Sequence, residues 1–231
     1  VYKRQDEAGN LHVEVKGHRD AKVLLSSHMD VVYQDIDTAL PIMKIGPVWT
    51  RRYGILGADD RAGITLIVST IRETSRRELP DLHIVFTVGE ETGQYGAEAI
   101  DEAVFEGIDF ALSCDRRGSR DIVTSCWIME YGSQKFGELL EQYANQRHHV
   151  NQRLGNESRR ITRGNEKDYR VCSGGISDLR VWSAYGINSA NLSVGYYEEH
   201  TDHEYLNIDE WMHALEAVSY THLRAHETSL H

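Results

Sequence analysis

The chain has 231 residues, with 36 Asp and Glu against 25 Lys and Arg, which gives a formal net charge of −11. This acidic balance argues against a partner such as nucleic acid or an anionic membrane, because no long basic stripe is present to neutralise phosphates. No apolar run approaches the ~18 residues of a membrane-spanning helix, so a small diffusible substrate fits better. The three cysteines, Cys114, Cys126 and Cys172, show no CxxC spacing. We therefore expect reduced thiols and a cytoplasmic location.

Short apolar runs alternate with longer amphipathic stretches along the chain, a pattern typical of an α/β layer fold. In chain order the pattern predicts strands over 11–15 and 22–26, a helix over 60–76, a strand over 82–88, a helix over 97–105, a strand over 110–114, a helix over 136–145, a loop over 148–170, a helix over 177–185, a strand over 188–194 and a helix from Asp209. The helix over 60–76 has apolar residues at helical spacing, so we expect it to pack by one face. The region after Arg116 is polar and irregular outside these elements.

Both ends of the chain, residues 1–5 and 218–231, lack the periodicity of their neighbours. Residues 1–5 can be encoded by GTG TAT AAG AGA CAG. The reverse complement of those codons, read in a shifted frame and extended, encodes Val-Ser-Tyr-Thr-His-Leu, which is the sequence at 218–223. We therefore expect both ends to be non-native tails translated from a sequencing adapter, and residues 6–217 to form one domain that is truncated at both ends.

Residues that can bind a metal ion follow the predicted strands at the points where the strands end. They are His28 and Asp30, the pair Asp59 and Asp60 at a helix start, the pair Glu90 and Glu91, then Asp115 and His200. Because ligands collect at the carboxyl ends of strands in open α/β sheets, these side chains are expected to converge. Imidazole and carboxylate without thiolate are typical ligands of zinc or a similar ion in a catalytic site. Their number suits two ions.

Each of these features also has a simpler explanation. A histidine near an aspartate is more often a surface hydrogen bond, and Asp59 with Asp60 could only cap the following helix. Asp115 and His200 are ambiguous when each is taken alone. The adjacent acids Glu90 and Glu91 are harder to dismiss, because they repel each other at a sheet edge unless a cation holds them.

Five strings carry a family resemblance: SSHMDVV, GILGADDRAG, VFTVGEETGQYGA, LSCDRRG and GGISDLRVWSAYGINSANLSVGYYEEHTDHEYLNIDE. They resemble the co-catalytic di-zinc exopeptidases, the group of peptidase T, the glutamate carboxypeptidases and the di-zinc aminopeptidases. The resemblance covers most of the chain between Lys22 and Glu210. It implies a three-layer α/β sandwich with a mostly parallel central sheet and helices on both faces. Residues 6–217 would then be a single zinc-peptidase catalytic domain.

The resemblance also implies roles for individual residues. One zinc ion, or cobalt or manganese in its place, would be held by His28, Asp59 and Asp115, and a second by Asp59, Glu91 and His200. Asp30 would orient His28 through its far ring nitrogen. Glu90 would be the general base. In that family the bridging aspartate precedes a cis peptide bond, which would here join Asp59 to Asp60.

The sequence departs from part of the family between Asp115 and His200, where the stretch is too short to hold a lid or dimerisation domain. Residues that would recognise a substrate carboxylate from a lid are therefore missing. Arg116 could contact an anion instead, or it could be a solvated surface arginine. Gly174 and Gly175 resemble a substrate-side loop, and His203 is expected to be a surface residue.

The function that this resemblance implies is zinc-dependent hydrolysis of the terminal bond of short peptides, as in an aminopeptidase or tripeptidase. One alternative is a deacylase of N-acyl amino acids, which would use the same metals and base. The other is a catalytically inactive metal-binding or interaction protein. The intact ligand and base positions argue against that third reading. We predict a small peptide as substrate and no nucleic acid or membrane partner. The sequence does not indicate an oligomeric state.

Overall fold

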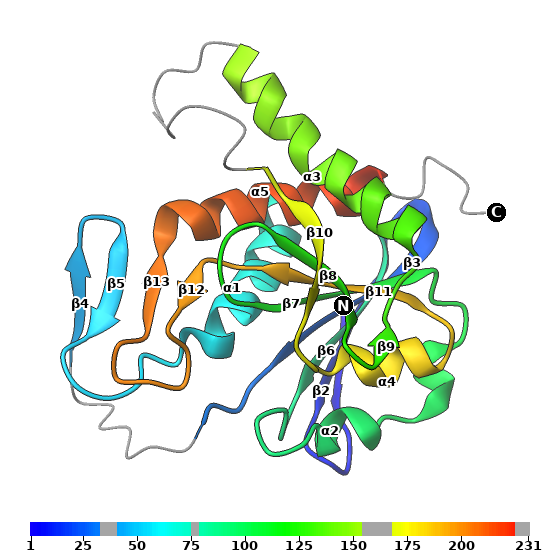
Figure 1. Ribbon diagram of the computed structural model, residues 1–231. Helices are drawn as coiled ribbons and strands as arrows, with labels where there is room; N and C mark the ends of the chain where they lie inside the picture. Colours follow the sequence, from blue (N-terminus) through cyan, green and yellow to red (C-terminus); the bar gives the residue numbers. More distant parts are fainter. Residues whose placement is uncertain (33–40, 75–78, 154–167, 225–231) are drawn as a thin grey trace.

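The computed structural model describes residues 1–32, 41–74, 79–153 and 168–224 (Figure 1). Nine strands in these residues form one sheet in the order β1-β2-β6-β3-β7-β11-β8-β10, with β9 paired to β8. Strands β3, β6, β7 and β11 run parallel to one another, while β2 and β8 lie antiparallel to β6 and β11. The strands are β1 Tyr2–Gln5, β2 Leu11–Val15, β3 Arg19–His28, β6 Pro80–Thr87, β7 Phe110–Arg116, β8 Asp121–Cys126, β9 Met129–Glu130, β10 Arg170–Gly174 and β11 Asn188–Ser193.

Helices cover both faces of this sheet (Figure 1). Successive strand residues point to opposite faces, so Val23 and Leu25 join one hydrophobic core while Leu24 joins the other. The first core lies under α1 Ala58–Glu73, α3 Gln134–Arg153 and α5 Ile208–Arg224. The second lies under α2 Tyr95–Glu98, the 3₁₀ turn η1 Glu102–Phe105 and α4 Leu179–Ala184. This confirms the predicted α/β fold with a mostly parallel sheet between two helical layers.

A second, four-stranded antiparallel sheet stands beside the main one, in the order β12-β13-β5-β4. Its strands are β4 Ile42–Ile45, β5 Val48–Arg51, β12 Tyr196–Tyr197 and β13 Tyr205–Asn207. The pairing of β12 with β13 closes the loop that carries His200. The sequence did not predict this sheet, because strands of two to four residues are too short for a periodic pattern.

Most predicted elements are confirmed, with boundary shifts of a few residues. The predicted helix over 97–105 is wrong: it is divided into α2 and η1, and the carboxylate of Asp101 accepts the Ala103 N–H to begin the second turn. The loop over 148–170 is also wrong at both ends, because α3 continues to Arg153 and β10 begins at Arg170. Residues 154–167 lie outside the described residues. The region after Arg116, expected to be irregular, supplies strands β8, β9 and β10 to the sheet.

The chain ends take part in this fold. Residues 2–5 pair with β2 as the edge strand β1, and α5 continues through Val218, which is fully buried, to Arg224. The adapter origin of both ends and the single domain over 6–217 stay predictions. Among the described residues, no helix is long and apolar enough to span a membrane.

Two buried histidines face each other between β2 and β6. His12 Nδ1 lies 3.1 Å from His83 Nε2. Burial, together with the charge of the neighbouring His12, lowers the pKa of His83 to about 4. In the unfolded chain the pKa of an imidazole is near 6.5, so over this interval the unfolded chain binds a proton that the folded chain does not.

We therefore expect the free energy of unfolding to fall as the pH decreases from about 6.5 to 4. His83 accounts for about 3 kcal/mol of this decrease. Urea unfolding across this range, in the wild type and in His83→Gln, measures the effect. Glutamine retains a hydrogen-bonding group near His12 but does not titrate, so its pH dependence should be shallower. Identical pH dependence in the two proteins would contradict the prediction.

Candidate active site

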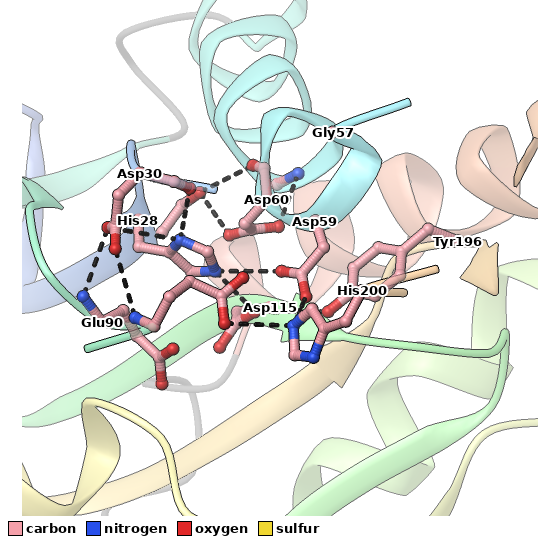
Figure 2. Close-up of polar contacts among 12 residues, drawn as sticks. His28, Asp30, Gly57, Asp59, Asp60, Glu90, Asp115, Tyr196 and His200 are labelled. Atoms are coloured by element: carbon pink, nitrogen blue, oxygen red, sulfur yellow. Dashed lines mark hydrogen bonds and ion pairs between the residues drawn. The ribbon is translucent and has the colours of Figure 1, made fainter. Parts of the chain in front are cut away.

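The predicted metal ligands come from separate elements that meet at one edge of the sheet (Figure 2). In the parallel register, His28 lies beside Thr87, and Ser26 lies beside Ser113. The ends of β3, β6 and β7 are therefore level, which places His28, Glu90 with Glu91, and Asp115 together. Asp59 comes from the first turn of α1 and His200 from the loop between β12 and β13.

The side chains form two groups of possible ligands that share Asp59. His28, Asp59 and Asp115 make one group, and Asp59, Glu91 and His200 make the other, with the ligand atoms of each group within 4.8 Å of one another. Asp59 Oδ1 lies 2.9 Å from His28 Nε2, and Asp59 Oδ2 lies 3.1 Å from His200 Nε2. Each oxygen of one carboxylate therefore faces a different group, an arrangement that suits a carboxylate bridging two ions through its two oxygens.

Asp115 completes the first group of ligands, and Glu91 completes the second. Asp115 Oδ1 lies 3.4 Å from His28 Nε2, and Glu91 Oε2 lies 3.0 Å from His200 Nε2. The other oxygen of Glu91, Oε1, is buried and has no hydrogen-bond partner in the described structure. Such an atom is costly to bury unless a cation or proton joins it, so this position fits a metal ligand.

The electrostatics of the cluster also fit bound cations. Burial, together with the charge of Asp115, raises the pKa of Glu90 to about 8. Burial, together with the charge of Asp59, raises the pKa of Glu91 to about 7. Burial lowers the pKa of His28, but the hydrogen bond and charge of Asp115 outweigh it and leave that pKa well above 6.5. The hydrogen bond to Asp59 raises the pKa of His200 to about 9. Without a cation, Glu90, Glu91 and the two histidines bind protons more tightly, which offsets the crowded negative charge.

The sequence left open whether Asp59 and Asp60 are metal ligands or only cap the following helix. The structure gives the two residues different contacts. The peptide bond between them is cis, as the resemblance implied. Asp60 is fully buried, accepts the Gly63 N–H at 3.1 Å and the Ser27 hydroxyl, and so caps the helix that follows. Asp59 points away from the helix toward the two histidines (Figure 2).

Glu204 fixes the backbone that carries Asp59. Its buried carboxylate accepts the N–H of Gly57 at 2.6 Å and the N–H of Asp59 at 2.9 Å. Sequence reasoning missed this residue, although it follows directly on the His-Thr-Asp-His string that contains His200. Its partners are 145 and 147 residues away, so no local pattern could reveal the contact.

Asp30 has a different set of contacts from the one the resemblance implied. His28 Nδ1 lies 2.9 Å from the backbone carbonyl of Asp30 and 3.6 Å from its carboxylate, so the carbonyl makes the hydrogen bond to the ring. The Asp30 carboxylate accepts the N–H groups of Glu90 and Glu91, both at 3.2 Å. Asp30 thus orients the ring through its backbone and the two glutamates through its side chain.

Asp115 is held by two further residues that the sequence analysis did not single out. The Tyr196 hydroxyl donates to Asp115 Oδ1 at 3.3 Å. The Asn191 side chain accepts the Asp115 N–H at 2.9 Å and donates to its carbonyl at 3.0 Å. β11 has the sequence NSANLS, in which Asn191 is one of several polar residues, so no pattern in the sequence singles it out.

A cavity of about 130 Å³ opens beside both groups. Its lining includes Glu90, which lies outside both ligand groups, and Gly175, one of the predicted substrate residues. Gly174, the other, ends β10 and packs against Val123 instead of lining the cavity.

Arg116 also borders this cavity, but its guanidinium is already paired with Asp121 at 2.9 and 3.0 Å. The Arg116 guanidinium is therefore not free to bind a substrate anion. Its neighbour Arg117 pairs with Glu199 at 3.1 Å. His203, expected at the surface, is exposed.

The chain is similar to known proteins in sequence and in fold. Residues 57–216 match the model of the M42 glutamyl aminopeptidase family. Over 122 residues the chain is 32% identical to the uncharacterized protein YqjE of Bacillus subtilis (strain 168), which covers 51% of this chain and 33% of that protein. It is 28% identical over 116 residues to carboxypeptidase G2 of Pseudomonas sp. (strain RS-16), covering 48% and 27%. The chain thus aligns with about a third or less of these curated relatives.

Solved structures share the fold at low sequence identity. The aminopeptidase PepT from Bacillus cereus ATCC 10987 matches with a TM-score of 0.70 and 17% identity, over 96% of this chain and 88% of that one. A tripeptidase from Staphylococcus aureus matches with a TM-score of 0.72 and 16% identity, over 98% and 89%. These likenesses support the fold.

Proposed function

The chain belongs to the M42 glutamyl aminopeptidase family, and on that premise we propose that it hydrolyses the terminal peptide bond of short peptides with two bound zinc ions. The observation that carries this proposal is the position of Asp59, which offers one carboxylate oxygen to each of two ligand groups. His28, Asp59 and Asp115 would hold one ion, and Asp59, Glu91 and His200 the other. Peptidases of this family depend on metal ions, and cobalt or manganese could replace zinc.

Two zinc ions, when bound, supply Lewis acidity that activates a water molecule and polarises the scissile carbonyl. The protein supplies the proton transfers. Glu90 lines the cavity without belonging to either ligand group, so its carboxylate is free to take a proton from the water and return it to the leaving amine. In the metal-free site the pKa of Glu90 is raised to about 8; two nearby cations would lower it, which leaves the carboxylate ionised and able to accept a proton.

The pairing of the arginines beside the cavity favours a free α-amino group over a carboxylate as the substrate terminus. Two bound zinc ions would offset the charge of Asp59, Glu90, Glu91 and Asp115, so these carboxylates do not decide the preference. The two nearby guanidinium groups, those of Arg116 and Arg117, are already paired with carboxylates. Neither is therefore free to bind a substrate carboxylate. This supports an aminopeptidase or tripeptidase-like activity.

A matched substrate panel tests the activity and its main alternative. The zinc-loaded protein should cleave a tripeptide with a free amino terminus and leave its N-acetylated form intact. Preferential cleavage of N-acetyl amino acids would instead indicate a deacylase with the same metals. Tight zinc binding without cleavage of either class would indicate a metal-binding protein that lacks catalysis.

Zinc binding is expected to release at least two protons at pH 7. His200, with a pKa of about 9, and His28, whose pKa is well above 6.5, are both protonated in the metal-free site, and Glu91 is partly protonated at a pKa of about 7. Metal ligands must be deprotonated, so apparent zinc affinity should rise with pH up to about 9. Titration calorimetry in buffers of different ionisation enthalpy measures the release. A binding heat that is the same in every buffer would contradict it.

A further inference from the structure

The loop over residues 88–96, here called the glutamate loop, carries both Glu90 and Glu91. Its two ends meet, because the Gly96 N–H donates to the Val88 carbonyl at 3.1 Å. A second bond inside the loop joins the Gln94 N–H to the Gly89 carbonyl at 2.7 Å. At the tip, Asp30 accepts the N–H groups of the two glutamates. The place of both glutamates therefore depends on Asp30 at the tip and on what holds the closed ends to the rest of the protein.

The side chain of Asn10 contacts both ends of the glutamate loop. Asn10 Oδ1 accepts the Val88 N–H at 3.1 Å, and Asn10 Nδ2 donates to the Gly96 carbonyl at 2.8 Å. Asn10 is fully buried. Gly96 allows this approach, because a Cβ there would lie 2.6 Å from Asn10 Oδ1 and 2.1 Å from the Val88 carbonyl oxygen. The loop ends and Asn10 are therefore fitted closely together.

Asn10 is in turn held by Asp6. The Asp6 carboxylate accepts the Asn10 N–H and the Asn10 Nδ2 group, both at 2.8 Å, and the Gly9 N–H at 2.9 Å. It also lies 3.0 Å from His12 Nε2. Burial raises the pKa of Asp6, but the hydrogen bonds from His12 and Asn10 outweigh it and lower that pKa below its ordinary value. The carboxylate is thus a charged anchor, and charge-assisted hydrogen bonds are the strong ones.

We propose that Asn10, anchored by Asp6 and His12, is a positioning residue that sets the place of Glu90 and Glu91 by holding both ends of the glutamate loop. The inference rests on the proposed function for the roles of the two glutamates. Loss of the Asn10 side chain leaves the Val88 N–H without this partner and removes one of two donors to the Gly96 carbonyl, which keeps the Ala99 N–H at 3.2 Å. The loop ends are then held less firmly, and small shifts of a base or ligand are costly to catalysis.

The proposal predicts an uneven effect on the two ions, because the glutamate loop supplies a ligand to only one of the two groups. In Asn10→Ala, affinity for the ion held by Asp59, Glu91 and His200 should fall about tenfold or more, as is typical when the support of a ligand is removed. Affinity for the other ion should change by less than about threefold. The kcat should fall about tenfold or more with KM nearly unchanged, because Glu90 acts on the reaction and not on substrate binding.

Asn145→Ala provides a matched control. Asn145 also joins two segments through two backbone hydrogen bonds, donating to the Tyr169 carbonyl at 2.9 Å and accepting the Tyr169 N–H at 2.8 Å. It lies on α3, outside the site. Asp6→Asn is a milder second variant, which keeps the Asn10 side chain but removes the charge that anchors it. It should change the same quantities in the same direction to a smaller extent.

The experiment combines zinc titration, steady-state kinetics and amide hydrogen exchange of the wild type and the three variants. The proposal expects faster exchange over 88–96 in Asn10→Ala and in Asp6→Asn, and not in Asn145→Ala. Equal loss of both zinc affinities, or unchanged exchange in the loop, would overturn it. If the wild type neither binds zinc nor cleaves peptides, the proposed function fails by itself. The exchange data still decide whether Asn10 holds the loop.

Discussion

Replacing Glu90 with glutamine is expected to lower kcat by at least about a hundredfold while the bound metal stays the same. Glutamine has nearly the same size and can retain the contact with Gln94 at 3.4 Å, but it cannot take a proton from water. Glu90 belongs to neither ligand group, so neither ion loses a ligand. Initial rates on a free tripeptide, together with metal analysis of the purified variant, measure both parts.

The control for this variant is Glu102→Gln, which removes an exposed carboxylate on η1 and should leave the rate unchanged. Activity in Glu90→Gln close to that of the wild type would show that another group transfers the proton. Loss of metal along with activity would show that Glu90 is a ligand.

The Asp59→Asn variant should have the largest effect on the metal centre. One amide oxygen cannot replace the two carboxylate oxygens that face His28 and His200 at 2.9 and 3.1 Å. We expect weaker binding of both ions and a loss of turnover of about a thousandfold or more. In the wild type zinc should raise Tm by binding the folded state, and this increase should nearly vanish in the variant.

Glu91→Gln is the matched comparison for Asp59→Asn, since Glu91 belongs to only one ligand group. This variant should bind one ion more weakly and bind the other ion as the wild type does. If Asp59→Asn also lost only one ion, Asp59 would not bridge, and the shared-carboxylate arrangement would be wrong.

Strand-end reasoning from the sequence located much of the site. His28, Glu90, Glu91 and Asp115 all follow apolar runs, and parallel strands bring their ends to the same edge. The structure places these four side chains together with Asp59 and His200, and the family match supports the resemblance on which their assignment rested. Their roles as ligands and base stay predictions until metal and activity are measured.

The residues that support the site could not be found in this way. Glu204, Asn10 and Asn191 act through hydrogen bonds to backbone groups between 76 and 147 residues away, and local periodicity carries no information about such contacts. For Arg116 the missed contact is local. Its partner Asp121 is only five residues away, but this pairing was not considered when Arg116 was predicted to contact an anion. The small second sheet was missed because its strands are short, and the split of α2 from η1 depends on a single capping carboxylate.

The central claim is that one carboxylate, that of Asp59, joins two metal ions. Anomalous diffraction at the zinc edge from crystals of the zinc-loaded protein tests it most directly. Two peaks are expected, one among His28, Asp59 and Asp115 and one among Asp59, Glu91 and His200, with Asp59 between them. A single peak, or a second peak that does not contact Asp59, would contradict it.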